Sequence, residues 1–501
     1  MARVGLWGMF DVESLGDVLS GRLIGAELRR RDANIQIDAR SPLGYVGLNR
    51  FTEPDPDDPF DHDAVSSLGA WSEARAAELG TGLDALVIVG ATLHDRDEEM
   101  AAAYGLGPLD MVVRAPHRFF VEGVGAITEV DVPTAWHAVK VPSAPSGDLA
   151  ERIVTAGRLH RLVTTRDAAS AANLAAVGLS DVEVAPDVLV LLPRYVPTEL
   201  IARRVEQLRA SQRLPAGLFI AIQADGALIH WVDQMADSLA AVCASRGLAP
   251  VVVETASILG DDVMAAGLAK RLPDAMRLGT ANALDVLAVI GAAEAVVGSS
   301  PPAITLAAAF DRPGVQLHLD GRGGPADVGT TPVADAATIA ATVQDALDRG
   351  STSANVERLQ DVADRYLDQL ASIVPAGSRT GPPAPLEAVD LPASTDLDAG
   401  SRSAAMRIRL ADHLAAIGAG QAGAAVQGGG VVDLVRRQSE EIAWLRGVVR
   451  DRERAAEGQA EEIAWLRDRA ERAEAELAAL RNTLAGKVGA RLSKRGREGT
   501  R

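Results

Sequence analysis

Three charged side chains lie just after an aliphatic run or a glycine-containing turn. Arg166 follows an aliphatic run, Asp187 follows Val184-Ala185-Pro186, and Asp17 opens a helical stretch after a glycine-containing turn. A guanidinium holds phosphate or carboxylate groups, and carboxylates serve as general acids or bases. We therefore predict that Asp17, Arg166 and Asp187 are catalytic. For each of them the open alternative is a helix cap or a structural ion pair.

The turn before Asp17 is rich in glycine. It begins with Gly5-Leu6-Trp7-Gly8 and ends with Leu15-Gly16-Asp17, between the first aliphatic run and the first helical stretch. At such a turn, backbone N–H groups and the positive end of the helix can hold an anion or a sugar hydroxyl, and glycine permits close approach. We predict that Gly5, Gly8 and Gly16 bind the donor substrate, the molecule that supplies a transferred group. The alternative is that Asp17 simply caps the helix.

The chain alternates short aliphatic runs with amphipathic helical stretches, twice over. This order predicts two parallel, helix-covered sheets, one within residues 1–195 and one within 196–375. The fold class is therefore α/β, with two Rossmann-like domains. The predicted strands are 3–7, 85–89, 138–141, 161–164, 182–184 and 188–192 in the first domain, and 217–223, 250–254, 295–297 and 314–319 in the second.

Several of these blocks together resemble the polysaccharide pyruvyl transferase family over roughly residues 3–375. The blocks are Gly16-Asp17, Trp136-His137-Ala138-Val139-Lys140-Val141-Pro142, Thr165-Arg166-Asp167-Ala168-Ala169-Ser170, and Pro186-Asp187. The resemblance implies a GT-B-like pair of domains that transfers a carboxyvinyl group from phosphoenolpyruvate, with no cofactor, to a sugar of a cell-surface glycan. It also implies that Ser170, Ser299 and Ser300 contact substrate.

One departure from the family concerns proton transfer. Where the family carries a histidine after a second-domain strand, this chain reads Ser299-Ser300-Pro301-Pro302, so that Pro302 takes the histidine position. A proline side chain neither donates nor titrates. His318, His230 and His94 are the candidates to supply the proton instead, and His137 and Lys140 also differ from the family pattern.

Two other functions stay open on the sequence. A GT-B glycosyltransferase that uses a nucleotide sugar has the same two-domain organisation and a similar turn. A non-catalytic scaffold that binds glycan or protein would explain Pro302. The expected partner is a glycan or a lipid-linked sugar acceptor.

Composition narrows these classes further. The 501 residues carry a formal net charge of −18, which disfavours general binding to nucleic acid. Cys243 is the only cysteine, and residues 1–10 lack the pattern of a secretion signal, so we expect a cytoplasmic protein. Neither a metal-ligand spacing nor a serine-hydrolase elbow nor a Walker motif occurs in the sequence.

The last part of the chain changes its period. Residues 376–430 are rich in Pro, Gly, Ser and Ala and are predicted to be a linker. In 431–485, the segment 440–446 returns as 461–467 at an offset of whole heptads, which predicts a coiled coil that forms a homodimer, with a solvated single helix as the alternative. The tail, 486–501, is basic, and it is either a weak contact to the inner face of the membrane or a disordered terminus.

Overall fold

The computed structural model describes residues 1–42, 44, 49–52, 55, 57–60, 65–93, 115–128, 131–256, 259–279, 281–319, 331–350 and 353–375. All of these belong to one compact unit, Met1–Ala393. The predicted linker (376–430), coiled coil (431–485) and basic tail (486–501) lie outside the described residues, as does His94. The homodimer and the membrane contact therefore stay predictions.

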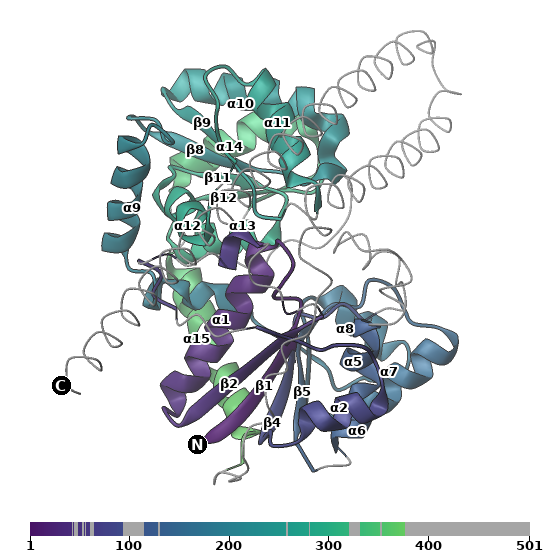
Figure 1. Cartoon of the computed structure of the whole chain (residues 1–501). Coiled ribbons are helices and arrows are strands. Elements are labelled where there is room, and N and C mark those ends of the chain that lie inside the picture. The colour runs from purple at the N-terminus through teal and green to yellow at the C-terminus, as the bar shows by residue number, and fades with distance from the viewer. Residues whose placement is uncertain are drawn as a thin grey trace, which may run out of the picture. The chain divides into compact units, whose positions relative to one another are not determined.

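The first sheet of the described chain has seven parallel strands in the order β3-β2-β1-β4-β5-β6-β7 (Figure 1). The strands are β1 Ala2–Gly8, β2 Ile35–Ser41, β3 Ser66–Ser67, β4 Ala85–Val89, β5 Thr134–Val139, β6 Leu162–Thr165 and β7 Glu183–Val184. Every residue of β4 is buried, with Val87 and Val89 in one core and Leu86 and Ile88 in the other. Burial on both faces explains why this strand is continuously aliphatic.

Helices cover both faces of this sheet. Helix α1 (Leu15–Arg31) packs on one face, and the other face carries a second group of helices that share the core of Trp7, Phe119 and Trp136 (Figure 1). That group comprises α2 Glu73–Gly80, α5 Pro116–Val121, α6 Gly123–Thr128, α7 Gly147–Leu159 and α8 Ala168–Ala175. The first sheet is therefore the middle of three layers.

The second sheet has six parallel strands among the described residues, in the order β10-β9-β8-β11-β12-β13. The strands are β8 Phe219–Gln223, β9 Ala249–Val253, β10 Met276–Leu278, β11 Val296–Gly298, β12 Gly314–Leu317 and β13 Thr331–Val333. Its helical elements are α9 Thr198–Ala210, η3 Gly226–Trp231, α10 Val232–Arg246, α11 Asp261–Arg271, α12 Ala283–Ala292, α13 Pro301–Ala309, η5 Ala336–Thr338 and α14 Ile339–Arg349. The predicted α/β class, with two Rossmann-like domains, is confirmed.

One predicted strand is wrong. Residues 188–192 form the start of a 3-10 helix, η2 (Val188–Arg194), and not a strand. Asp187 caps it, because its side chain accepts a hydrogen bond from the N–H of Leu189 at 3.0 Å. All five residues of the aliphatic run are buried, since η2 lies between α1, α13 and the last described helix. A short run that is buried on every side has no period to distinguish strand from helix.

A long helix, α15 (Ser353–Ser372), follows the second sheet in sequence yet packs on elements of the first domain. Its contacts include α1 and η2, and Figure 1 shows α15 beside α1. The hydroxyl of Tyr366 lies 2.7 Å from Nδ1 of His137 on β5 and 3.2 Å from Oγ1 of Thr164 on β6. The chain therefore returns to the first sheet after completing the second.

Each sheet reverses its strand order at one point, between β1 and β4 in the first and between β8 and β11 in the second. In open parallel sheets, ligands bind beyond the carboxyl ends of the strands at such a switch point. The residues that follow these four strands are therefore the candidates for ligand contact.

Candidate functional site

The two carboxyl edges touch at the start of α1. The N–H of Leu15 donates to the carbonyl oxygen of Thr255 at 2.7 Å, and Ser14 forms an isolated bridge with Ala256. A Cβ atom added at Gly16 would lie 2.6 Å from Cγ of Pro302, so glycine is what allows α1 to approach α13 this closely. Both switch points consequently border one region.

An ion pair ties η1 (Arg50–Thr52) to the same region. The Arg50 guanidinium lies 2.9 Å from a carboxylate oxygen of Glu13 and 3.2 Å from one of Glu254, which directly follows β9. Glu254 also pairs with Arg277 at 2.7 Å. These contacts join the first domain to the second with charges that are mostly shielded from solvent, where an ion pair is screened less than at the surface.

Arg166 and Asp17, predicted from different parts of the chain, lie together at the first switch point. Nη2 of Arg166 donates to the carbonyl oxygen of Gly90 at 2.9 Å and is 3.8 Å from Oδ1 of Asp17. The Arg166 side chain is 43% exposed and that of Asp17 is 29% exposed, so both are open to a ligand. A cation and a carboxylate are thus presented side by side beyond the ends of β4 and β6.

Asp187, the third predicted catalytic residue, lies near this pair. Besides capping η2, its carboxylate accepts a hydrogen bond from Thr305 of α13. It also interacts electrostatically with Arg166. Burial raises the pKa of Asp187 above its usual range, although these hydrogen bonds and the Arg166 charge work in the opposite direction. Asp187 therefore holds its proton more tightly than an ordinary aspartic acid does.

His137 is a site-adjacent residue whose importance sequence reasoning missed. The sequence showed it only as a departure from a family pattern. Its ring stacks on that of Tyr366 at a centroid distance of 5.1 Å. Burial, and then the charge of Arg166, lower the pKa of His137 to about 3, so the imidazole is neutral at physiological pH. Its partner is far away in sequence, and no local signal could have found it.

The predicted donor-binding residues of the first domain are engaged by the protein itself. The space beside Gly5 is filled by Leu83 and that beside Gly8 by Phe10, since a Cβ atom there would come within 2.8 and 2.7 Å of those side chains. Oγ of Ser170 accepts a hydrogen bond from the N–H of Val141 at 3.0 Å. Their part in donor binding stays a prediction.

Ser299 and Ser300 lie at the second switch point, in a buried network. Both backbone N–H groups donate to Oε1 of Gln223, at 3.1 and 2.8 Å, and Oγ of Ser299 accepts from the N–H of Asp225 at 2.9 Å. Pro301 and Pro302, at the start of α13, have no N–H to offer. The two amides just before α13 are thus bound to Gln223, and a donor-binding role for these serines also stays a prediction.

Asp261 completes that network. Its Oδ2 accepts hydrogen bonds from Nε2 of Gln223 and from the N–H and the hydroxyl of Thr255, each at 2.9 Å, while Oδ1 has no partner among the described residues. Burial raises the pKa of Asp261 to about 7, against the effect of these hydrogen bonds.

The Asp261 carboxyl predicts a pH dependence of stability. The folded state holds this proton more tightly than the unfolded chain does. The protonated carboxyl therefore stabilises the fold fully below the ordinary pKa of 3.8, and this stabilisation is lost as the pH rises to about 7. Asp261→Asn, which does not titrate, should remove a slope on the order of 1 kcal/mol per pH unit between pH 4 and 7. Urea unfolding at a series of pH values measures it.

Asp274→Asn is the matched control for Asp261→Asn. Asp274 is exposed and has a φ of 55°, a conformation that asparagine adopts readily. This control should keep the wild-type pH profile. An unchanged slope in Asp261→Asn would contradict the assigned role of the carboxyl.

The remaining histidine candidates lie on the second domain. His230 is in η3 with its ring 5.2 Å from that of Trp231, and His318 follows β12, where its N–H donates to the carbonyl oxygen of Val333. Within the described ranges, no group of three or more His, Cys, Asp or Glu side chains is placed to hold a metal ion. No described helix is both long and apolar enough to cross a membrane.

Comparison with known proteins yields fold likeness alone. No protein-family model matches the sequence, and no curated protein matches it. The structure is similar to UDP-GlcNAc 2-epimerase from Methanocaldococcus jannaschii, with 12% identity, a TM-score of 0.44, and coverage of 72% of this chain and 99% of that one. It is also similar to E. coli ADP-heptose lps heptosyltransferase II, with 12% identity, a TM-score of 0.37, and coverage of 70% and 99%.

A third similar structure is Anabaena Alr3699/HepE in complex with UDP and glucose, with 13% identity, a TM-score of 0.46, and coverage of 74% of this chain and 100% of that one. All three are named for a nucleotide sugar or were solved with a nucleotide and a sugar. Identities and TM-scores this low transfer no activity to this chain. The resemblance to pyruvyl transferases likewise stays a prediction.

Proposed function

We propose that this chain is a glycan-directed group transferase that takes a sugar from a phosphate-activated donor of the nucleotide-sugar type. The observation that carries the proposal is the exposed Arg166–Asp17 pair, at a switch point that borders the second domain's switch point through Gly16 and Pro302. Ligands of open parallel sheets bind at such points.

Glycosyl transfer makes few demands on the site, and this pair meets them. The leaving diphosphate gains negative charge as the bond to the sugar breaks, and a guanidinium stabilises that charge. The acceptor hydroxyl loses a proton as it attacks, and a carboxylate takes that proton. Arg166 supplies the first function and Asp17 the second. No histidine is needed at the position that Pro302 occupies.

Carboxyvinyl transfer from phosphoenolpyruvate is the second candidate, and Asp187 favours it. That reaction needs a general acid that protonates the enol carbon, in addition to a base and a cation. Burial raises the pKa of Asp187 although the charge of Arg166 acts against it, so this carboxyl keeps its proton more readily than an ordinary aspartic acid. The blocks that resemble pyruvyl transferases contribute these same three residues.

Titration calorimetry with two donor classes separates the candidates. UDP-, GDP- and ADP-sugars form one arm, and phosphoenolpyruvate forms the other. We expect a nucleotide sugar to bind and, at one hundred times its dissociation constant, to stabilise the fold by about 2.7 kcal/mol. Binding of phosphoenolpyruvate with every nucleotide silent would move the assignment to pyruvyl transfer. Silence in both arms would leave the scaffold hypothesis.

A further inference from the structure

The second domain has a surface cavity whose lining includes neither Arg166 nor Asp17. Its volume is about 420 Å³, and it is lined by Trp231, Gln234, Asp237, Ser238 and residues 334–337. The first four lie at the junction of η3 and α10, which follow β8, and the others follow β13. The cavity therefore opens beside the carboxyl edge of the second sheet, where α10 contacts η5.

Trp231 gives this cavity an aromatic wall. The chain is poor in aromatic residues, at 3% of its length, and Trp7 and Trp136 are fully buried. Trp231 is instead partly exposed and lines the cavity. A partly exposed indole in an open cavity offers a flat apolar face to a ligand, with the ring nitrogen as a hydrogen-bond donor.

Polar groups surround that face. Gln234 and Ser238 on α10 follow Trp231 at the spacing that places residues on the same helix face. Asp237 lies beside them in the lining. Gln234 and Asp237 are exposed. Amides and hydroxyls both donate and accept hydrogen bonds, and carboxylates accept strong ones from hydroxyl groups. Across the cavity, Asp335 accepts from the N–H of Ala337 at 3.0 Å.

The charge of the lining selects among ligand classes. Asp237 and Asp335 are both acidic, and the described residues of the lining include no lysine or arginine. The two carboxylates would repel a phosphate or a uronate. A neutral ligand with apolar C–H faces and many hydroxyl groups matches every feature of the lining.

We infer that this cavity is a binding site for a neutral saccharide, with Trp231 as its stacking platform and Gln234, Asp237 and Asp335 as hydroxyl partners. The inference does not rest on the function proposed above, because saccharide binding here needs neither a donor nor turnover. It gives the second domain a glycan contact separate from the Arg166–Asp17 pair.

Saturation-transfer NMR and calorimetry on the full chain, without any donor, test the inference. The probes are neutral oligosaccharides: cellobiose, maltotriose and N,N′-diacetylchitobiose. At least one should bind with little dependence on salt, and Trp231→Ala should weaken it by about tenfold or more. Trp231→Phe should keep part of the affinity. Trp71→Phe, which alters a partly exposed indole of the first domain, should leave binding unchanged.

Three outcomes would overturn the inference. The first is that none of the three oligosaccharides binds at millimolar concentration. The second is equal affinity in wild type and Trp231→Ala. The third is preferential binding of an amine probe, N-acetyl-lysine amide, that weakens with salt, which would indicate a cation site. Should Trp231→Ala fail to fold, the exposed-residue variant Gln234→Ala/Asp237→Ala takes its place with the same expected loss.

Discussion

Replacing Arg166 by alanine should lower kcat/KM for the activated donor by about 100- to 1,000-fold. The guanidinium is an exposed cation at the first switch point, 3.8 Å from Oδ1 of Asp17, and its Nη2 donates to the carbonyl oxygen of Gly90. Removing one group that stabilises developing negative charge typically costs this much. Steady-state kinetics with the donor identified by calorimetry measure the effect.

Companion variants define what Arg166 does. Arg166→Lys keeps the charge but loses the planar fork, and should recover only part of the activity. Asp17→Asn should lower kcat while donor affinity stays within about threefold, because a base acts on the acceptor and not on the donor phosphates.

Arg161→Ala is the matched control for the Arg166 variants. Arg161 is exposed and immediately precedes β6, whereas Arg166 follows the same strand, so the two arginines stand at opposite edges of the sheet. A control variant as inactive as Arg166→Ala would show that the loss reflects general charge or folding, and would contradict the assigned site.

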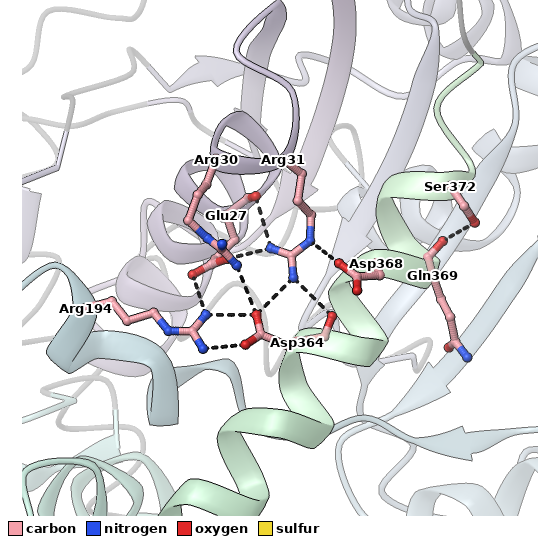
Figure 2. Close-up of polar contacts among 8 residues, drawn as sticks. All are labelled: Glu27, Arg30, Arg31, Arg194, Asp364, Asp368, Gln369 and Ser372. Atoms are coloured by element: carbon pink, nitrogen blue, oxygen red, sulfur yellow. Dashed lines mark hydrogen bonds and ion pairs between the residues drawn. The ribbon is translucent and has the colours of Figure 1, made fainter.

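The second large effect concerns Glu27, at the centre of an ion network that docks α15 on α1 (Figure 2). Its carboxylate is fully buried and lies 2.9 Å from Arg30, 2.5 Å from Arg31 and 3.3 Å from Arg194. The same arginines also contact Asp364 of α15. Figure 2 shows all three guanidinium groups placed between Glu27 and Asp364.

Glu27→Gln should lower the free energy of unfolding by about 3–5 kcal/mol. Glu27 is the fully buried member of this network, and removing a buried partner of an ion pair costs far more than losing a surface pair. Urea unfolding, followed through the midpoint and the slope, measures the change.

Asp368→Asn tests whether burial is the cause. Asp368 accepts a hydrogen bond from Nε of Arg31 at 2.8 Å in the same network, but its side chain is 69% exposed. This variant should change stability by less than about 1 kcal/mol. Equal losses in Glu27→Gln and Asp368→Asn would contradict the explanation.

The network also gives stability a defined acid limit. Burial alone would raise the pKa of Glu27, but the hydrogen bonds and charges of its arginines outweigh burial and lower it below 4.5. The pKa of Asp364 is lowered to about 2, mainly by the hydrogen bond from Arg194. A carboxylate whose pKa is lowered in the folded state stabilises the fold at pH values above its ordinary pKa. That stabilisation is lost as the pH falls below the ordinary pKa toward the folded-state pKa. On acidification, the free energy of unfolding should therefore fall less in Glu27→Gln than in the wild type.

The parallel sheets could be predicted from sequence because their signal is local. Residues 85–89 are continuously aliphatic, and the structure buries both faces of β4 there. The same reasoning failed at 188–192, since an equally aliphatic run is buried on all sides as η2. Only packing against α1, α13 and α15 distinguishes the two cases.

Glu27 shows the same limit for single residues. In the sequence it stands among Arg29, Arg30 and Arg31 near the end of a helix, the usual setting of an exposed acid. The structure buries it because α15 returns across it. Tyr366 and His137 meet for the same reason, although they are 229 residues apart.

The sequence by itself determined the α/β class, the two-domain order and the polar residues at strand ends, because hydrophobic period and turn chemistry depend on neighbours along the chain. Tertiary structure alone decided that Arg166, Asp17 and Asp187 gather in one region, that Pro302 packs on Gly16, and that Trp231 lines a cavity. Such contacts join residues distant in sequence, and they form only where folded elements pack against one another.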